Sequence, residues 1–221
     1  MIPSFSMRRS SRCRDGRETF ISIAHLEIEP GMGMERFPLW RICMRSQKAA
    51  FWAIPLYKEY CETHPDQKIV LMGDSAGGGL VAALAEQFKE DGIRMPDELI
   101  LLSPWVDMSM ENEQIKEYEP RDPFLPMSQL VMCANYWKGD LDLHDRRLSP
   151  IYGDVKGIRN VTAFVGTCEL FYPDVTKFFG MLDEDPSNEL IVGEEMNHVY
   201  PLLPIKEAEP AVEKIIQKVK R

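Results

Sequence analysis

The sequence has no hydrophobic run long enough to cross a bilayer. Its longest stretch without Asp, Glu, Lys or Arg covers residues 123–137 and contains Ser128, Gln129 and Asn135. It is too short and too polar for a membrane-spanning helix. The chain also lacks a basic excess, since its net charge is −9, so no nucleic-acid partner is expected. Its 221 residues are 44% hydrophobic and 28% charged, which is typical of one folded domain.

Cysteine is scarce, and its spacing excludes the usual roles of paired cysteines. The five residues are widely spaced, and no C-x-x-C pair exists, so we expect neither a zinc site nor a thioredoxin-type redox site. An odd number of scattered thiols is typical of a reducing compartment. Arg8 and Arg9 are not followed by a long apolar segment, so we expect no secretion signal and a cytoplasmic location.

The composition changes near residue 48. Residues 1–48 carry nine basic and five acidic side chains, a net of +4, whereas residues 49–221 carry seventeen and thirty, a net of −13. The first segment shows only one possible strand, at residues 20–28. It could be a basic arm for an acidic partner or a transit peptide. Composition favours a third interpretation, in which residues 1–48 are poorly ordered or lie outside the fold of residues 49–221. An altered reading frame or a mis-set start would produce such a change.

From residue 49 onward, short apolar runs alternate with helical patterns. This alternation predicts an α/β fold with a mainly parallel sheet, in which active sites lie at the carboxyl ends of the strands. The predicted strands are 68–73, 98–102, 161–166 and 188–192. The predicted helices are 49–63, 75–91, 127–137, 173–182 and 207–220. The last helix is expected to bury one stripe, formed by Ala208, Val212, Ile215, Ile216 and Val219.

The first of these strands runs directly into a glycine-rich turn. Residues 73–79 read GDSAGGG, which fits G-x-S-x-G between a strand and a helix and predicts a nucleophile elbow at Ser75. Gly73 and Gly77 flank the serine because a side chain at either place would collide across the tight turn. The turn places Ser75 at the start of the helix, so the backbone N–H of Ala76 is a candidate oxyanion donor. The alternative is a plain helix cap with serine as the capping residue.

A serine nucleophile needs a base and an acid that orients it. Among four histidines, only His198 follows a predicted strand and precedes the terminal helix, and it is our candidate base. Glu169 lies three residues beyond the strand 161–166 and is the favoured acid. Asp107 and Asp174 remain alternatives, although Asp174 is expected to cap the next helix.

Residues 53–221 resemble the hormone-sensitive-lipase-like α/β hydrolases, the group of carboxylesterases and acetyl esterases. The matching segments are 73–79 (GDSAGGG), 103–109 (SPWVDMS), 122–125 (DPFL), 148–154 (LSPIYGD), 165–174 (VGTCELFYPD) and 196–204 (MNHVYPLLP). The resemblance implies an α/β-hydrolase fold that cleaves short-chain acyl esters without a metal or organic cofactor. Ser75 matches the family's nucleophile and His198 its base. Glu169 stands where the family usually has Asp. A homodimer is possible by analogy with the family.

The sequence departs from this family in its first part. The family carries an H-G-G-G motif whose backbone N–H groups complete the oxyanion hole, and this chain has none. The nearest glycine pair is Gly31 and Gly33, and it matches neither that motif nor a dinucleotide fingerprint. We therefore expect the N-terminal part of the fold to be missing or altered, which would leave the edge of the strand 68–73 open to self-association. The candidate functions are a serine esterase and a catalytically inactive hydrolase remnant.

Overall fold

The computed structural model describes the backbone of residues 8–9, 18–22 and 46–220, and the side chains of residues 53–220. Its strands form one sheet in the order β1-β2-β3-β4-β5-β6. All neighbouring pairs are parallel except β1 and β2. The strands are β1 (Arg8–Arg9), β2 (Glu18–Ser22), β3 (Lys68–Asp74), β4 (Glu98–Leu102), β5 (Val161–Gly166) and β6 (Glu189–Gly193). The α/β class and the mainly parallel sheet are thus confirmed.

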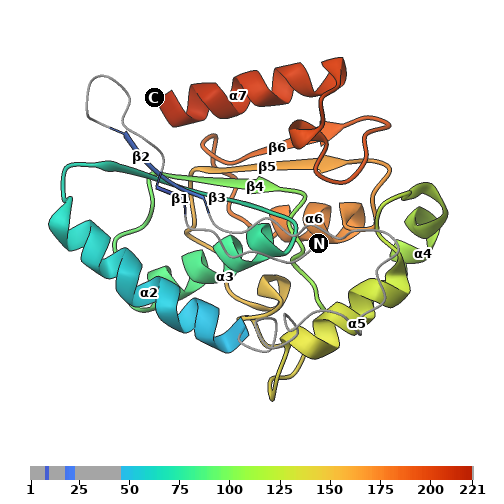
Figure 1. Cartoon of the computed structure of the whole chain (residues 1–221), viewed down its shortest axis with the longest axis horizontal. Helices are drawn as coiled ribbons and strands as arrows, with labels where there is room; N and C mark the ends of the chain where they lie inside the picture. Colours follow the sequence, from blue (N-terminus) through green and yellow to red (C-terminus); the bar gives the residue numbers. More distant parts are fainter. Residues whose placement is uncertain (1–7, 10–17, 23–45, 221) are drawn as a thin grey trace.

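Helices cover both faces of the sheet, which makes three layers (Figure 1). The α-helices are α2 (Ser46–Thr63), α3 (Ala76–Glu90), α4 (Ile115–Tyr118), α5 (Met127–Trp137), α6 (Tyr172–Phe179) and α7 (Glu209–Lys220). The terminal helix α7 lies on one face, and α2, α3 and α6 lie on the other. The short 3-10 turns are Glu119–Arg121, Pro150–Tyr152, Tyr200–Leu202 and Lys206–Ala208.

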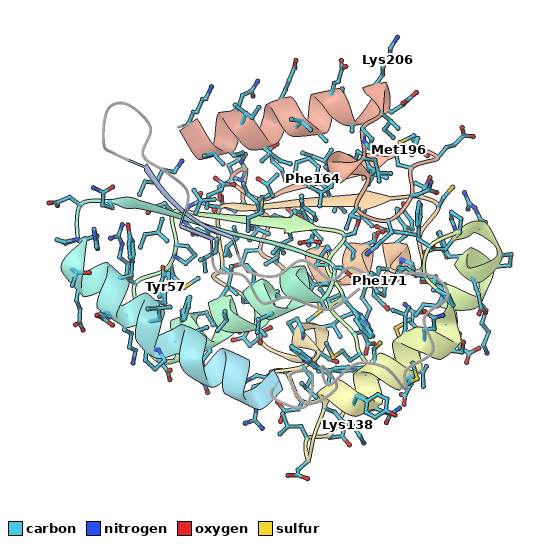
Figure 2. The ribbon with its side chains drawn as sticks, viewed as in Figure 1. Tyr57, Lys138, Phe164, Phe171, Met196 and Lys206 are labelled. Carbon is cyan, nitrogen blue, oxygen red and sulfur yellow. The ribbon has the colours of Figure 1, made fainter. Side chains whose placement is uncertain are left out.

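The central strands are apolar along their whole length because both of their faces are covered. Every residue of β4 and β5 is buried. Side chains of successive residues point to opposite faces of a sheet, so Ile100 packs toward α7 while Leu99 and Leu101 pack toward α2 and α3. Figure 2 shows Phe164 on the α7 side and Tyr57 between the sheet and α2. This pattern is typical of a parallel sheet enclosed by helices.

The expected stripe of α7 is only partly correct. Val212 and Ile216 are 38% and 43% exposed, whereas Ala211 is buried and Ile215 is partly buried. Lys218 is also buried, because its ammonium group pairs with Glu98 and Glu189 at 3.3 and 3.1 Å. The predicted stripe was based on apolar residues alone. The face of α7 that meets the sheet also includes Lys218 and its ion pairs. The inner face of α7 is therefore Ala211, Ile215, Lys218 and Val219, and Ala208 is buried in the 3-10 turn that precedes the helix.

The edge of β3 is paired, which corrects the expectation of an open edge beside the nucleophile. Strand β2 runs parallel to β3 in a register that joins Glu18 to Lys68 and Ser22 to Met72. The strand expected at residues 20–28 therefore lies at Glu18–Ser22, and its remaining residues fall outside the described part of the chain. No helix within the described ranges is both long enough and apolar enough to cross a membrane.

The helix α3 carries a buried carboxylate in its C-terminal half. Glu86 is 2% exposed, and neither of its carboxylate oxygens has a hydrogen-bond partner. The backbone of Gly153 lies so close that a Cβ there would come within 1.6 Å of Oε2. Burial raises the pKa of Glu86 from 4.5 to about 7, against the opposing charges of Arg146 and Lys89. The folded chain therefore favours the protonated acid.

We expect stability to fall as the pH rises through 7. The folded pKa of Glu86 exceeds the unfolded value, so this contribution is fully present below pH 4.5 and lost above about pH 7. Its size is about 1–3 kcal/mol. Glu86→Gln keeps the shape without the charge, so its midpoint of thermal unfolding should exceed that of the native chain at pH 8 and match it at pH 5. Parallel curves of melting temperature against pH for the two proteins would contradict this assignment.

Candidate active site

Ser75 lies at the sharp turn between β3 and α3. Its backbone is strained, with φ 53° and ψ −124°, a region that non-glycine residues rarely adopt. A Cβ on Gly73 would come within 2.4 Å of the backbone oxygen of Gly77. Only glycine at position 73 lets the chain reverse this tightly, which agrees with the reason inferred from the motif. The serine side chain makes no capping hydrogen bond to α3, so the plain helix-cap alternative lacks its defining contact.

The backbone of Ser75 is fixed by the neighbouring strand and the segment after it. Its N–H donates to the Leu102 carbonyl at 2.9 Å, and its carbonyl accepts from Gly79 at 3.1 Å and Trp105 at 2.9 Å. A Cβ on Gly79 would lie 2.1 Å from the Trp105 oxygen, so α3 packs directly on this segment. Ala76 is the first residue of α3, and N–H groups of a first turn have no acceptor within their own helix.

Glu169 and His198 form a buried pair. Glu169 is fully buried and His198 is 7% exposed. The Nδ1 and Oε2 atoms lie 2.6 Å apart, and Oε1 accepts the N–H of Gly166 at 3.0 Å. Both carboxylate oxygens are therefore engaged. An Nδ1–H that donates to the carboxylate leaves Nε2 as the proton acceptor of a neutral imidazole.

The loop that carries His198 is held against the ends of β4 and β5. The N–H of Val199 donates to Ser103 Oγ at 2.9 Å, and both residues have positive φ, at 51° and 45°. The N–H of Cys168 donates to the Met196 carbonyl at 3.0 Å. Strained residues that contact each other in this way need the surrounding fold to hold them. Sequence reasoning missed Ser103, because only its place directly after a strand singles it out.

Ser75 and His198 follow β3 and β6, which are separated by β4 and β5, and both lie at the carboxyl end of the sheet. Ser75 binds Leu102 through its backbone, and the next residue, Ser103, binds Val199 beside the base. An aromatic bridge also links them, because Trp105 stacks on Phe171 at 5.6 Å, and that ring meets the His198 ring edge-on at 5.2 Å. No hydrogen bond joins Ser75 Oγ to His198 in the described part of the chain. Such contacts are often longer before substrate binds.

The two alternative acids have other partners. Asp107 accepts from Ser109 through Oδ1 and from the Tyr152 hydroxyl through Oδ2 at 3.0 Å. Asp174 lies inside the first turn of α6 and accepts from Asn112 at 2.7 Å, so it does not cap that helix as expected. The helix α6 begins at Tyr172, so Asp174 is its third residue, and its carboxylate lies on the buried side of the helix. Burial raises the pKa of Asp174 to about 6.

The other histidines of the described residues lie away from this site. His64 stacks on Tyr60 at the end of α2, and His25 lies outside the described residues. His144 is exposed, and hydrogen bonds to Asp142 and Glu111 raise the pKa of its imidazole. Within the described residues, no group of three or more His, Cys, Asp or Glu side chains could hold a metal ion.

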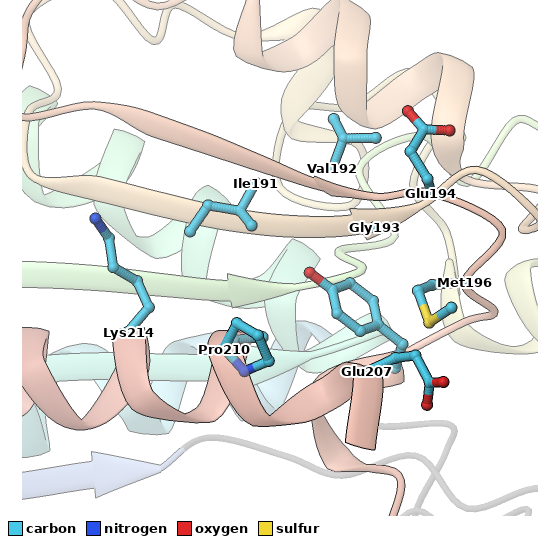
Figure 3. A pocket seen from close by; sticks show the side chains of 10 residues that line it. Ile191, Val192, Gly193, Glu194, Met196, Glu207, Pro210 and Lys214 are labelled. Atoms are coloured by element: carbon cyan, nitrogen blue, oxygen red, sulfur yellow. The ribbon is translucent and has the colours of Figure 1, made fainter. Parts of the chain in front are cut away.

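A pocket of about 430 Å³ lies elsewhere, between the edge strand β6 and α7 (Figure 3). Its lining includes Ile191, Met196, Tyr200 and Lys214 but none of Ser75, Glu169 and His198. It borders the loop that carries the base without opening onto the serine. The chemistry of the site therefore comes from the strand ends, not from this pocket.

Comparison with known proteins agrees with the fold. Residues 47–202 match the protein family described as alpha/beta hydrolase fold. An esterase of Acinetobacter venetianus is 31% identical over 111 residues, and an acetyl-hydrolase of Streptomyces hygroscopicus is 28% identical over 110 residues. Each alignment covers 50% of this chain and 37% of the relative.

A solved structure of a hormone-sensitive-lipase homologue from a metagenome library superposes with a TM-score of 0.71 at 25% identity. The match covers 85% of this chain and 63% of that one. The alignments with the Acinetobacter and Streptomyces proteins span little more than a third of the length of each of those relatives. The matched range includes Ser75, Glu169 and His198. This chain belongs to the α/β-hydrolase family and is similar to the hormone-sensitive-lipase homologues within it.

Proposed function

We propose that the chain hydrolyses short-chain carboxylic esters with Ser75 as nucleophile, His198 as base and Glu169 as the orienting acid. The observation that carries this proposal is the buried 2.6 Å contact between His198 Nδ1 and Glu169 Oε2, in a fold that also presents a strained elbow serine. A buried carboxylate on Nδ1 selects the imidazole tautomer whose Nε2 can take the serine proton. The esterase and acetyl-hydrolase names of the relatives support the class of substrate.

In the first half of the reaction, Ser75 Oγ forms a bond to the ester carbonyl carbon while His198 Nε2 takes the hydroxyl proton. The carbonyl oxygen becomes an oxyanion that accepts the N–H of Ala76, with the start of α3 favouring its negative charge. The carbon–oxygen bond to the alcohol then breaks, and the imidazolium returns its proton to the leaving alcohol. Glu169 stabilises the imidazolium without itself becoming protonated.

In the second half, water replaces the alcohol. His198 takes a proton from the water as its oxygen bonds to the acyl carbon, and a second oxyanion forms at Ala76. The bond from Ser75 Oγ to the acyl carbon breaks, and the proton returns to Oγ. The products are one carboxylic acid and one alcohol, and no cofactor enters the balance.

The second candidate function is that of a catalytically inactive α/β-hydrolase. The observation in its favour is the lack of an H-G-G-G motif anywhere in the sequence, which leaves Ala76 as the assigned oxyanion donor. Losing one such donor costs about 10²–10³-fold in rate. An esterase with Ala76 alone would therefore be slow, and an inactive chain would retain the fold without turnover.

A covalent label distinguishes these two functions. The purified chain is assayed with p-nitrophenyl acetate and butyrate, and is then treated with diethyl p-nitrophenyl phosphate. For an esterase we expect turnover that stops when one diethylphosphoryl group is attached, located on Ser75 by mass spectrometry of the digested chain. A folded chain that shows neither turnover nor labelling would favour the inactive hydrolase.

A further inference from the structure

Asp122 joins the segment before α5 to the loop that carries Glu169. Its Oδ1 accepts the N–H groups of Phe124 and Leu125 at 2.8 and 3.0 Å. Its Oδ2 accepts the N–H of Leu170 at 2.8 Å. Leu170 directly follows Glu169 in the sequence. One carboxylate thus spans two chain segments that are 48 residues apart, and one of them carries the acid of the site.

Other contacts hold these two segments together. The side chain of Leu170 is fully buried in the same apolar cluster as Leu125, so separating the segments would expose apolar surface. On the other side of Glu169, the Arg121 guanidinium donates to Cys168 Sγ at 3.7 Å. Hydrogen bonds to an ionised carboxylate are stronger than neutral ones, which makes the carboxylate of Asp122 the main polar link.

We propose that Asp122 is a positioning residue, which holds the backbone after β5 so that Glu169 reaches His198. This inference rests on the proposed function. Glu169 stands in a short loop between β5 and α6 and must place Oε2 within 2.6 Å of Nδ1. A loop displaced by about 1 Å lengthens that contact, and misplacements of this size cost on the order of 10²-fold in rate. Asp122 touches neither substrate nor the reacting atoms, so its effect passes through Glu169.

Asp122→Asn separates the two halves of this link. Asparagine has the same shape but only one accepting oxygen. That oxygen can still accept from Phe124 and Leu125, and its NH₂ then faces the N–H of Leu170, so the contact to the acid loop is lost. We expect kcat for p-nitrophenyl butyrate to fall about 10- to 100-fold while KM changes less than about twofold.

A matched control shows whether any lost carboxylate would have the same effect. Asp185 Oδ1 likewise accepts a backbone N–H, from Ser187 at 2.9 Å, but it precedes β6 at the amino end of the sheet. We expect kcat of Asp185→Asn to equal that of the native chain. If Asp122→Asn does not fold, Asp122→Ser takes its place, because its hydroxyl can serve the local turn but is too short to reach Leu170.

A second readout does not depend on turnover. The Nδ1 proton of His198, hydrogen-bonded to Glu169, is followed by NMR, and we expect it to exchange faster with solvent in Asp122→Asn than in the native chain. Unchanged kcat and unchanged exchange in Asp122→Asn would overturn the inference, as would an equal loss of kcat in Asp185→Asn. A native chain without ester hydrolysis would reject the proposed function, and the exchange comparison would still decide the role of Asp122.

Discussion

Glu169→Gln is expected to lower kcat by about 10⁴-fold, with a much smaller change in KM. In the native chain, Oε2 faces His198 Nδ1 and Oε1 accepts the N–H of Gly166. Glutamine keeps the shape, but its amide has one accepting oxygen, so an NH₂ group faces one of these two N–H donors. The imidazolium formed during the reaction also loses its counter-charge. Steady-state hydrolysis of p-nitrophenyl butyrate measures both constants.

Two further variants calibrate this result. Ser75→Ala removes the proposed nucleophile, so its residual rate of hydrolysis is the baseline against which the other variants are compared. Glu169→Asp keeps the charge with a shorter reach and should lose less activity than Glu169→Gln. Native-like kcat in Glu169→Gln, with an unchanged circular dichroism spectrum, would mean that another acid orients His198.

Gly166→Ala is expected to destabilise the fold by about 3 kcal/mol or more and to abolish hydrolysis. A Cβ at this position would lie 2.1 Å from the Met196 carbonyl oxygen and 2.9 Å from that of Asn197. These are backbone atoms just before His198, so they can move only if the whole loop moves. The loss corresponds to a fall of about 6–12 °C in the midpoint of thermal unfolding.

Gly180→Ala is the matched control for this substitution. A Cβ on Gly180 would meet its nearest atoms at 3.4 Å, an ordinary contact, and its φ of −67° suits alanine. We expect its activity to match the native value. Its melting temperature should equal the native value or slightly exceed it. Equal melting temperatures for Gly166→Ala and Gly180→Ala would show that the loop before His198 can shift without cost.

The regular elements could be predicted from the sequence where local pattern and tertiary environment agree. The strands Glu98–Leu102 and Val161–Gly166 and the helix Met127–Trp137 have the predicted bounds. Fully buried strands need continuous apolar runs, which are visible in the sequence. The short helix Ile115–Tyr118 was missed, because four residues are too few to show a helical period.

The terminal helix shows where pattern alone was insufficient. Apolar residues at helical spacing occur on more than one face of α7, and the sequence cannot say which face meets the sheet. The ion pairs of Lys218 with Glu98 and Glu189 join residues far apart in the chain. They lie on the face of α7 that meets the sheet, and Val212 and Ile216 are on the exposed face.

By itself, the sequence determined the elbow and the order of the site residues along the chain. The turn at Ser75 is local, because Gly73 and Gly77 are separated by three residues and their contact depends on short-range sterics alone. Which acid meets His198 was decided only by the tertiary structure. Glu169, Asp107 and Asp174 all lie near the carboxyl ends of strands, and only the packing of separate loops directs one carboxylate to the imidazole.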